Sequence, residues 1–283
     1  MTAAREHGGQ RVTRGESPVK VSIVTVVYDG VATLADALRS VREQQCSASF
    51  EHIVVDGGSS DGTVELLREQ GDSIAYWCSE RDRGIYDAMN KGIALARGEI
   101  IGILNADDTY ECEAIQRAVQ ALEADPGAGY CYGWLRLVDA CGRPLGVVQP
   151  VSRDRFASRV TRETPLPHPT MFVRRSVYEQ YGVFDSLLRL AGDFELILRL
   201  HLQGVRGIEI PAVMANFLIG GASTNPLILT EQRQTALKYG APAWRAWSDW
   251  AVARSSMAVK RWLPASAIGW LRHFKQRVFL RAR

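Results

Sequence analysis

The apolar positions in the first half of the chain switch repeatedly between two spacings. Continuous β-branched runs, the first at Val19–Tyr28, are typical of strands buried on both faces of a sheet. Between these runs apolar residues recur at helical spacing, as Leu34, Leu38 and Val41 do. Strands are predicted at 19–28, 52–55, 73–78 and 99–104, and helices at 34–41, 64–68, 85–96 and 114–122. This alternation predicts βαβ units and an α/β fold, with a mostly parallel central sheet flanked by helices.

The spacing changes after Gly129. Two strand-like runs, 130–138 and 145–149, flank a short segment with Gly142 and Pro144, which predicts a hairpin. A strand at 170–173, a helical turn at 176–181 and a helix at 193–202 are predicted to follow. No linker-like composition separates the halves, so residues 19–128 and 129–224 are predicted to form one domain, after a flexible leader at 1–18.

Charge and tryptophan are concentrated near the C-terminus. The chain has a formal net charge of +3, yet residues 241–283 hold nine Lys or Arg, one acid and five of the seven tryptophans. The remainder is therefore mildly acidic, which argues against a nucleic-acid partner. Residues 225–283 are predicted to form a basic, Trp-rich helical extension.

The last predicted helix is amphipathic. Trp270, Phe274 and Val278 fall on one face, and basic side chains lie outside it. This pattern indicates either contact with a membrane surface or packing against the body or a second subunit.

Three other classes of feature are missing from the pattern. No apolar run approaches the roughly 18–20 residues of a membrane span, and the first 17 residues lack the apolar core of a signal peptide. The five cysteines are odd in number and contain no C-x-x-C pair. A reducing, cytoplasmic compartment is expected, with peripheral contact at the inner face of the cell membrane as a further expectation.

Each of the first four predicted strands is followed by acidic residues. The acids are Asp29, Asp56, Glu80 with Asp82, and Asp107 with Asp108. Ligands of open α/β sheets bind beyond the carboxyl ends of the strands, where these four exits meet. So many carboxylates would repel one another unless a cation or a hydroxyl-rich ligand lay between them.

The exits suggest specific ligands. Asp107 and Asp108, after a hydrophobic strand, are hard oxygen ligands suited to Mg²⁺ or Mn²⁺, although either could simply cap a helix. Asp56, in a glycine-rich turn, could accept hydrogen bonds from a base or ribose, or only shape the turn. Arg83 or Lys91 could reach a diphosphate, or remain a solvated charge.

Four ordered motifs resemble the family 2 glycosyltransferases, which have the A-type, Rossmann-like nucleotide-sugar fold. The matching segments are Val21–Asp29, Val54–Thr63, Gly84–Gly92 and Gly98–Asp108, within a resemblance that covers roughly residues 20–220. The resemblance implies that Thr25, Tyr28 and Asp56 surround the nucleoside. Its D-x-D motif corresponds to Asn105-Ala-Asp107, which makes Asp107 the metal ligand with Asp108 beside it.

The resemblance also implies a catalytic base and an acceptor side. Asp193 matches the base that deprotonates the acceptor hydroxyl, and Gly192 stands where relatives carry a second acid. His168 and Glu195 are candidate acceptor-side residues, with a strand-entry role as the alternative for His168. Gly220 begins a loop, 220–223, similar to one that closes over the diphosphate in relatives.

The resulting hypothesis is a metal-dependent, inverting transferase. It would move a sugar from a nucleotide diphosphate sugar, with uridine as the expected base, to a lipid-linked or polysaccharide acceptor. A nicotinamide dehydrogenase is disfavoured because no G-x-G-x-x-G turn follows the first strand, and a sugar-nucleotide pyrophosphorylase because no basic, glycine-rich N-terminal loop is present. A catalytically inactive scaffold of the same family is the alternative left open by Asn105 and Gly192.

Overall fold

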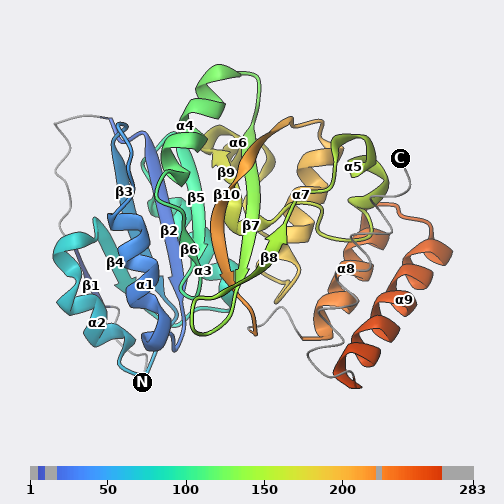
Figure 1. The fold of residues 1–283 in the computed structure, drawn as a ribbon, viewed down its shortest axis with the longest axis horizontal. Coiled ribbons are helices and arrows are strands. Elements are labelled where there is room, and N and C mark those ends of the chain that lie inside the picture. The colour runs from blue at the N-terminus through green and yellow to red at the C-terminus, as the bar shows by residue number, and fades with distance from the viewer. Residues whose placement is uncertain (1–5, 10–17, 221–224, 263–283) are drawn as a thin grey trace. The chain divides into compact units, whose positions relative to one another are not determined.

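A ten-stranded mixed sheet forms the first of the two units into which the chain divides, residues 1–223 and 224–283 (Figure 1). The structure, a computed structural model, describes residues 6–9, 18–220 and 225–262. In spatial order the strands are β1 (Glu6–Gly8), β4 (Tyr76–Ser79), β3 (Phe50–Asp56), β2 (Val21–Val27), β5 (Ile100–Asn105), β9 (Phe172–Arg174), β7 (Tyr130–Val138), β10 (Gly207–Leu218) and β6 (Thr109–Tyr110), and β8 (Pro144–Val148) pairs with β7.

The longest pairings in the sheet are parallel. Strands β4, β3, β2 and β5 run parallel to one another, and β7 runs parallel to β10. Strands β1, β6, β8 and β9 join antiparallel. The predicted α/β class with a mostly parallel sheet is confirmed, and so is the hairpin, which is formed by β7 and β8. Four adjacent parallel strands bring their four following loops to one edge.

Helices cover both faces of the sheet. They are α1 (Val31–Arg42), α2 (Thr63–Glu69), α3 (Ile85–Leu95), α4 (Ala114–Ala124), α5 (Arg153–Arg159), α6 (Arg175–Tyr181) and α7 (Gly192–Leu202), with 3₁₀ turns at Gly71–Ser73 and His168–Thr170. Val21 and Ile23 pack in one core with α1 and α4. Val24 points to the opposite face, where a Cβ on Gly92 would lie 2.1 Å from Val24 Cγ1. Helix α3 therefore packs so closely on β2 that only glycine fits there.

The second unit is helical, which confirms the predicted C-terminal helices. Its described helices are α8 (Leu227–Lys238) and α9 (Ala243–Trp262). The guanidinium of Arg233 in α8 lies 3.9 Å from the centroid of Trp247 in α9 and 5.0 Å from that of Trp250, a cation–π arrangement. The amphipathic segment with Trp270 and the loop from 221 to 224 lie outside the described residues. Among the described helices, none is both long and apolar enough to cross a bilayer.

Strand β1 corrects part of the predicted flexible leader. Glu6–Gly8 pairs antiparallel with β4, and both Glu6 carboxylate oxygens bond to Arg68, at 2.6 and 2.7 Å. The sequence carried no signal for this pairing because three residues are too few to show an alternation.

Two further elements were not predicted, for different reasons. Strand β10 contains Pro211, which cannot donate to a ladder, and the structure absorbs it with a register shift between Glu209 and Val213. Helix α5 buries none of its residues, so it has no apolar stripe to detect.

Phe172 offers a test of the core. Its fully buried ring stacks on Tyr110, with centroids 5.3 Å apart, where β9 joins β5. We expect Phe172→Ala to lower the free energy of unfolding by about 3–5 kcal/mol through lost burial and a residual cavity. Leu187→Ala is the control, because Leu187 is 88% exposed, and it should change stability by less than about 0.5 kcal/mol. Urea denaturation of both variants measures the difference, and equal effects would contradict this account of the core.

Candidate active site at the carboxyl edge of the sheet

The loops after β2 and β3 are tied together by side-chain hydrogen bonds. Asp29 has a φ of 47°, in the left-handed region that Asp and Asn tolerate best. Its N–H donates to Ser59 Oγ at 2.7 Å, and its Oδ1 accepts from Ser60 N at 2.8 Å. Asp61 accepts from Val31 N at 3.0 Å and from Thr63 N at 3.0 Å, so one carboxylate serves the first turns of both α1 and α2. These bonds give the edge a fixed backbone.

Asp56 is fully buried at the end of β3 and organises the glycine-rich turn. Its Oδ2 accepts from Gly58 N at 3.1 Å, Ser59 N at 3.0 Å and Ser79 Oγ at 2.6 Å, and its Oδ1 accepts from Ser59 Oγ. Asp56 thus shapes the turn, as one of its two predicted roles requires. The predicted contact of Asp56 with a nucleoside stays a prediction.

The two candidates on β2 differ in position. Tyr28 is 67% exposed just past the strand, where a nucleoside could stack on it. Thr25 has no exposed surface, and its Oγ1 lies 2.8 Å from His52 Nε2 inside the sheet. Burial lowers the pKa of His52 to about 3, so the ring is neutral. The Thr25 side chain therefore faces the core, and its expected contact with the nucleoside stays a prediction.

The predicted cations Arg83 and Lys91 converge on an acid of α3. Arg83 Nη2 lies 2.8 Å from Asp87 Oδ1, and Lys91 Nζ lies 3.6 Å from Asp87 Oδ2 and 3.1 Å from Glu80 Oε1. The Arg83 side chain is largely exposed. Both cations therefore lie around Asp87 in the first turn of α3. Their contact with a diphosphate stays a prediction.

Asp82, one of the acids predicted to follow the third strand, lies against the glycine-rich turn. A Cβ on Gly57 would lie 2.5 Å from Asp82 Oδ2, and Asp82 Oδ1 accepts from Gly84 N at 2.9 Å. Burial raises its pKa above the ordinary value.

Asn105 and Asp107 stand at the end of β5. Asn105 Oδ1 is buried and has no hydrogen-bond partner among the described residues. Burial raises the pKa of the half-buried Asp107 carboxyl. Both features fit a divalent cation, since an unpaired amide oxygen and a desolvated carboxylate each gain from one. The described residues contain no group of three or more His, Cys, Asp or Glu side chains able to hold a metal by themselves, so substrate phosphates would have to complete the coordination.

Asp108 is turned away from the edge. It is 1% exposed, its Oδ1 accepts from Leu218 N of β10 at 3.3 Å, and its Oδ2 accepts from Asn105 Nδ2 at 3.4 Å. Burial, and secondly the charge of Asp107, raise its pKa well above the ordinary value. In this structure the Asp108 carboxyl joins β5 to β10, and its expected role as a metal ligand stays a prediction.

Asp193 lies in the first turn of α7, and its pKa is strongly perturbed. Burial raises its pKa to about 6, against an ordinary value of 3.8. Its Oδ1 accepts from Phe194 N at 2.7 Å and lies 3.5 Å from the hydroxyl of Tyr86 in α3. A carboxyl with a pKa near 6 is ionised at neutral pH and basic enough to take a proton, as a general base must.

The two acceptor-side candidates lie inside the protein. Glu195 is buried and forms a two-point ion pair with Arg199, at 2.9 and 3.0 Å. Its expected contact with an acceptor stays a prediction. It lies two residues after Asp193 and so points to another side of the helix. His168 is nearly buried edge-on against Phe184, with ring centroids 5.5 Å apart, and burial lowers its pKa to about 4. The strand-entry alternative describes His168 best.

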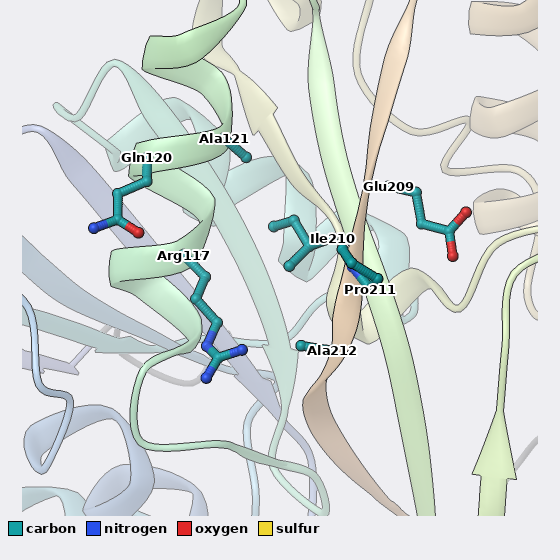
Figure 2. A pocket seen from close by; sticks show the side chains of 7 residues that line it. All are labelled: Arg117, Gln120, Ala121, Glu209, Ile210, Pro211 and Ala212. Carbon is teal, nitrogen blue, oxygen red and sulfur yellow. The ribbon is translucent and has the colours of Figure 1, made fainter.

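A shallow hollow of about 380 Å³ lies away from these residues, between α4 and β10. Figure 2 shows the side chains that line it: Arg117, Gln120, Ala121, Glu209, Ile210, Pro211 and Ala212. Arg117 is paired with Glu113 at 2.5 Å, and none of the predicted site residues lines the hollow. The carboxyl edge therefore remains the candidate active site.

Comparison with known sequences points to one family. The family described as "Glycosyl transferase family 2" matches residues 22–182. An uncharacterized glycosyltransferase of Mycobacterium tuberculosis is 35% identical over 210 residues, covering 72% of this chain and 77% of that protein. A PGL/p-HBAD biosynthesis glycosyltransferase of Mycobacterium bovis is 27% identical over 183 residues, covering 63% and 68%.

Solved structures share the fold. S. aureus TarS (residues 1–349), in complex with UDP-GlcNAc, aligns with a TM-score of 0.62 at 16% identity, covering 82% of this chain and 70% of that one. The mannosyltransferase PcManGT of Pyrobaculum calidifontis, in complex with GDP-Man and Mn²⁺, aligns with a TM-score of 0.60 at 21% identity, covering 92% and 80%.

The raised pKa of Asp193 predicts a stability cost. Between the ordinary value of 3.8 and about 6 the folded chain binds a proton that the unfolded chain releases. Stability contributed by this group therefore falls as pH rises through that interval. Asparagine keeps an oxygen that can accept from Phe194 N but carries no charge. We expect Asp193→Asn to raise the free energy of unfolding at pH 7.5, by at most about 3 kcal/mol, and to lose this gain by pH 4.

Urea denaturation at both pH values measures this effect. Asp36→Asn, at an exposed ion pair with Arg39, is the control and should change stability little at either pH. An Asp193→Asn protein that is no more stable than the wild type at pH 7.5 would contradict the assigned burial.

Proposed function

Because the chain belongs to glycosyl transferase family 2, we propose that it transfers a sugar from a nucleotide diphosphate sugar to an acceptor hydroxyl, with inversion at the anomeric carbon. The observation that carries the proposal is Asp193, whose carboxyl has a pKa of about 6 and contacts the helix that starts at the carboxyl edge. A direct displacement needs one base, on the face opposite the leaving group. Asp193 supplies it from α7, while the donor would lie along the loops of β2, β3 and β5.

The donor in this proposal is a UDP-sugar. Exposed Tyr28 offers a surface for the base, and the rigid turn built on Asp56 offers backbone groups to the ribose. The TarS complex with UDP-GlcNAc supports uridine as the base of the donor. The GDP-Man complex of the mannosyltransferase makes guanosine the alternative base.

Mg²⁺ or Mn²⁺ in this proposal would be held by Asp107 and the unpaired Oδ1 of Asn105. The Mn²⁺ in the mannosyltransferase complex supports a metal requirement. When bound, the ion neutralises charge on the leaving diphosphate. Arg83 and Lys91, paired with Asp87, add positive charge nearby that a diphosphate can compete for.

Catalysis on the acceptor side then rests on this chain's own residues. Asp193 is held at the start of α7 by its bond to Phe194 N. It accepts the proton of the acceptor hydroxyl as that oxygen attacks the anomeric carbon. A base with a pKa near 6 predicts activity that falls as pH drops below about 6.

Two substitutions separate binding from turnover. We expect Asp107→Ala to abolish the Mn²⁺-dependent thermal shift caused by UDP and to remove transfer, because the principal metal ligand is lost. Asp193→Asn should keep the thermal shift and lose about 10²–10⁴-fold in kcat, the usual contribution of a general base. Asp36→Asn should behave as wild type in both assays. The measurement is sugar release from UDP- and GDP-sugars with and without acceptor.

The outcomes discriminate between an enzyme and a scaffold. Wild-type turnover in Asp193→Asn would remove Asp193 from the mechanism. A wild-type chain that binds UDP with Mn²⁺ but turns over no sugar nucleotide would favour the inactive scaffold, and a preference for GDP would overturn the uridine assignment.

The acceptor in this proposal is lipid-linked or part of a polysaccharide, reached at the cytoplasmic face of a membrane. All five cysteines are free, as a reducing compartment requires. On α9, Trp244 and Trp247 are 75% and 52% exposed. Exposed tryptophan on a basic helix is typical of a membrane-surface contact.

Vesicle sedimentation tests the membrane contact. The double variant Trp244→Ser, Trp247→Ser should bind vesicles containing phosphatidylglycerol about tenfold more weakly, because two indole rings no longer enter the interface. Val252→Ser is the control, since Val252 is also exposed but carries no indole ring. Equal binding by all three proteins would contradict the contact, and a concentration-dependent dimer lost in the double variant would favour a subunit interface instead.

A further inference from the structure

Two consecutive residues of α3, Tyr86 and Asp87, contact the acceptor side and the donor side of the candidate site. Asp87 faces the cations Arg83 and Lys91 on the donor side. Tyr86, the preceding residue, is 5% exposed and directs its hydroxyl to within 3.5 Å of Asp193 Oδ1. Catalytic hydrogen bonds are often this long before substrate binds. Phe194 N donates to the same oxygen at 2.7 Å, so both contacts fix Oδ1.

Gly192 makes room for this contact. A Cβ at residue 192 would lie 2.8 Å from three atoms of the Tyr86 ring, Cδ2, Cε2 and Cζ. Residue 192 does not have a positive φ, so glycine is required here for space and not for backbone conformation. The ring of Tyr86 thus fills the volume that any side chain at 192 would need.

The Tyr86 ring is also held from its other face. It stacks on Phe184 with centroids 5.4 Å apart. The main chain of Phe184 is fixed by the Asn90 side chain, whose Nδ2 donates to Phe184 O at 2.9 Å and whose Oδ1 accepts from Phe184 N at 3.0 Å. Asn90 lies one turn beyond Tyr86 on α3. Ring and hydroxyl are therefore placed by two points on the same helix.

We propose that Tyr86 is the positioning residue of the catalytic base: its hydroxyl orients the Asp193 carboxylate, and Gly192 is the gap that admits it. The inference rests on the proposed role of Asp193. In this proposal the Tyr86 hydroxyl takes the place of the second acid that relatives carry at the position of Gly192. The orientation of the Asp193 carboxylate then depends on the position of α3.

Among the described residues, Tyr86 is the one whose side chain hydrogen-bonds to the Asp193 carboxylate and shifts its pKa. On the same helix, Glu195 is engaged with Arg199. His168 is separated from Tyr86 by Phe184 and is neutral, since burial lowers its pKa to about 4. The Tyr86 hydroxyl bonds to the carboxylate and so lowers the pKa of Asp193 against the larger, opposing effect of burial.

Tyr86→Phe removes the hydroxyl and keeps the ring. We expect kcat to fall about tenfold, as for loss of one hydrogen bond to a charged group, with the KM for the donor unchanged. The acid limb of the kcat–pH profile should move to higher pH, because the Asp193 pKa rises when the bond is lost. Tyr178→Phe is the matched control: Tyr178 is buried and packs against the same Phe184 at 6.3 Å, and its variant should keep the wild-type kcat and pH profile.

Gly192→Ala tests the gap from the other side. We expect it to lower kcat at least tenfold in the presence of Tyr86, because the new methyl group displaces the ring, and to add little further loss to Tyr86→Ala. Such non-additivity is the mark of two residues that share one space. Circular dichroism and the UDP thermal shift confirm that each variant is folded and binds donor.

The outcomes separate this inference from the proposed function. An inactive Asp193→Asn together with a Tyr86→Phe protein of wild-type kcat and pH profile would overturn the role of Tyr86 alone. Full activity of Asp193→Asn would overturn the base assignment first. Additive losses in Gly192→Ala and Tyr86→Ala would overturn the shared-space account.

Discussion

A carboxylate that loses its water needs hydrogen bonds, a cation or a proton, and the carboxyl edge of this sheet depends on how each of its acids meets that need. Asp56 is satisfied entirely by its own loop and by Ser79, and serves as the rigid part of the edge. Asp107 and Asp193 are not satisfied in this way, and burial raises the pKa of each. The acids whose pKa burial raises are the ones to which we assign chemistry, because a cation or a substrate proton would relieve the cost of burying their charge.

Helix α3 makes the two halves of the site interdependent. It packs on β2 through Gly92, so its position follows the parallel core. Asp87 pairs with Arg83 and Lys91, and the Tyr86 hydroxyl reaches Asp193, the proposed base. A shift of α3 would therefore move these cations and reorient the Asp193 carboxylate together. The cations at Asp87 and the carboxylate of Asp193 are therefore coupled through the two contacts of one rigid helix, without movement of a loop.

The sequence predicts the parts of this protein that local patterning determines. The β-branched runs identify β2 and β5, and the acids after them identify the edge, because strand direction alone brings those exits together. Side-chain direction could not be predicted as well. Thr25 and Glu195 occupy motif positions but face the core, since the face each presents depends on His52 and Arg199, which are partners only in the folded chain. Strand β10 was missed because Pro211 interrupts its pattern, and a register shift compensates for proline only when β7 is present.

Asn105 and Gly192, the two departures from the family pattern, have separate physical explanations that both favour a working site. Burial already raises the pKa of Asp107 and Asp108, and each charge disfavours the other. A third carboxylate at 105 would add to that repulsion, whereas an amide offers an unpaired Oδ1 without charge and donates through Nδ2 to Asp108. At 192 the acid is replaced by space for a ring that brings a hydroxyl to Asp193. In both places a charge gives way to a neutral polar group, which costs less to desolvate and still makes the contact.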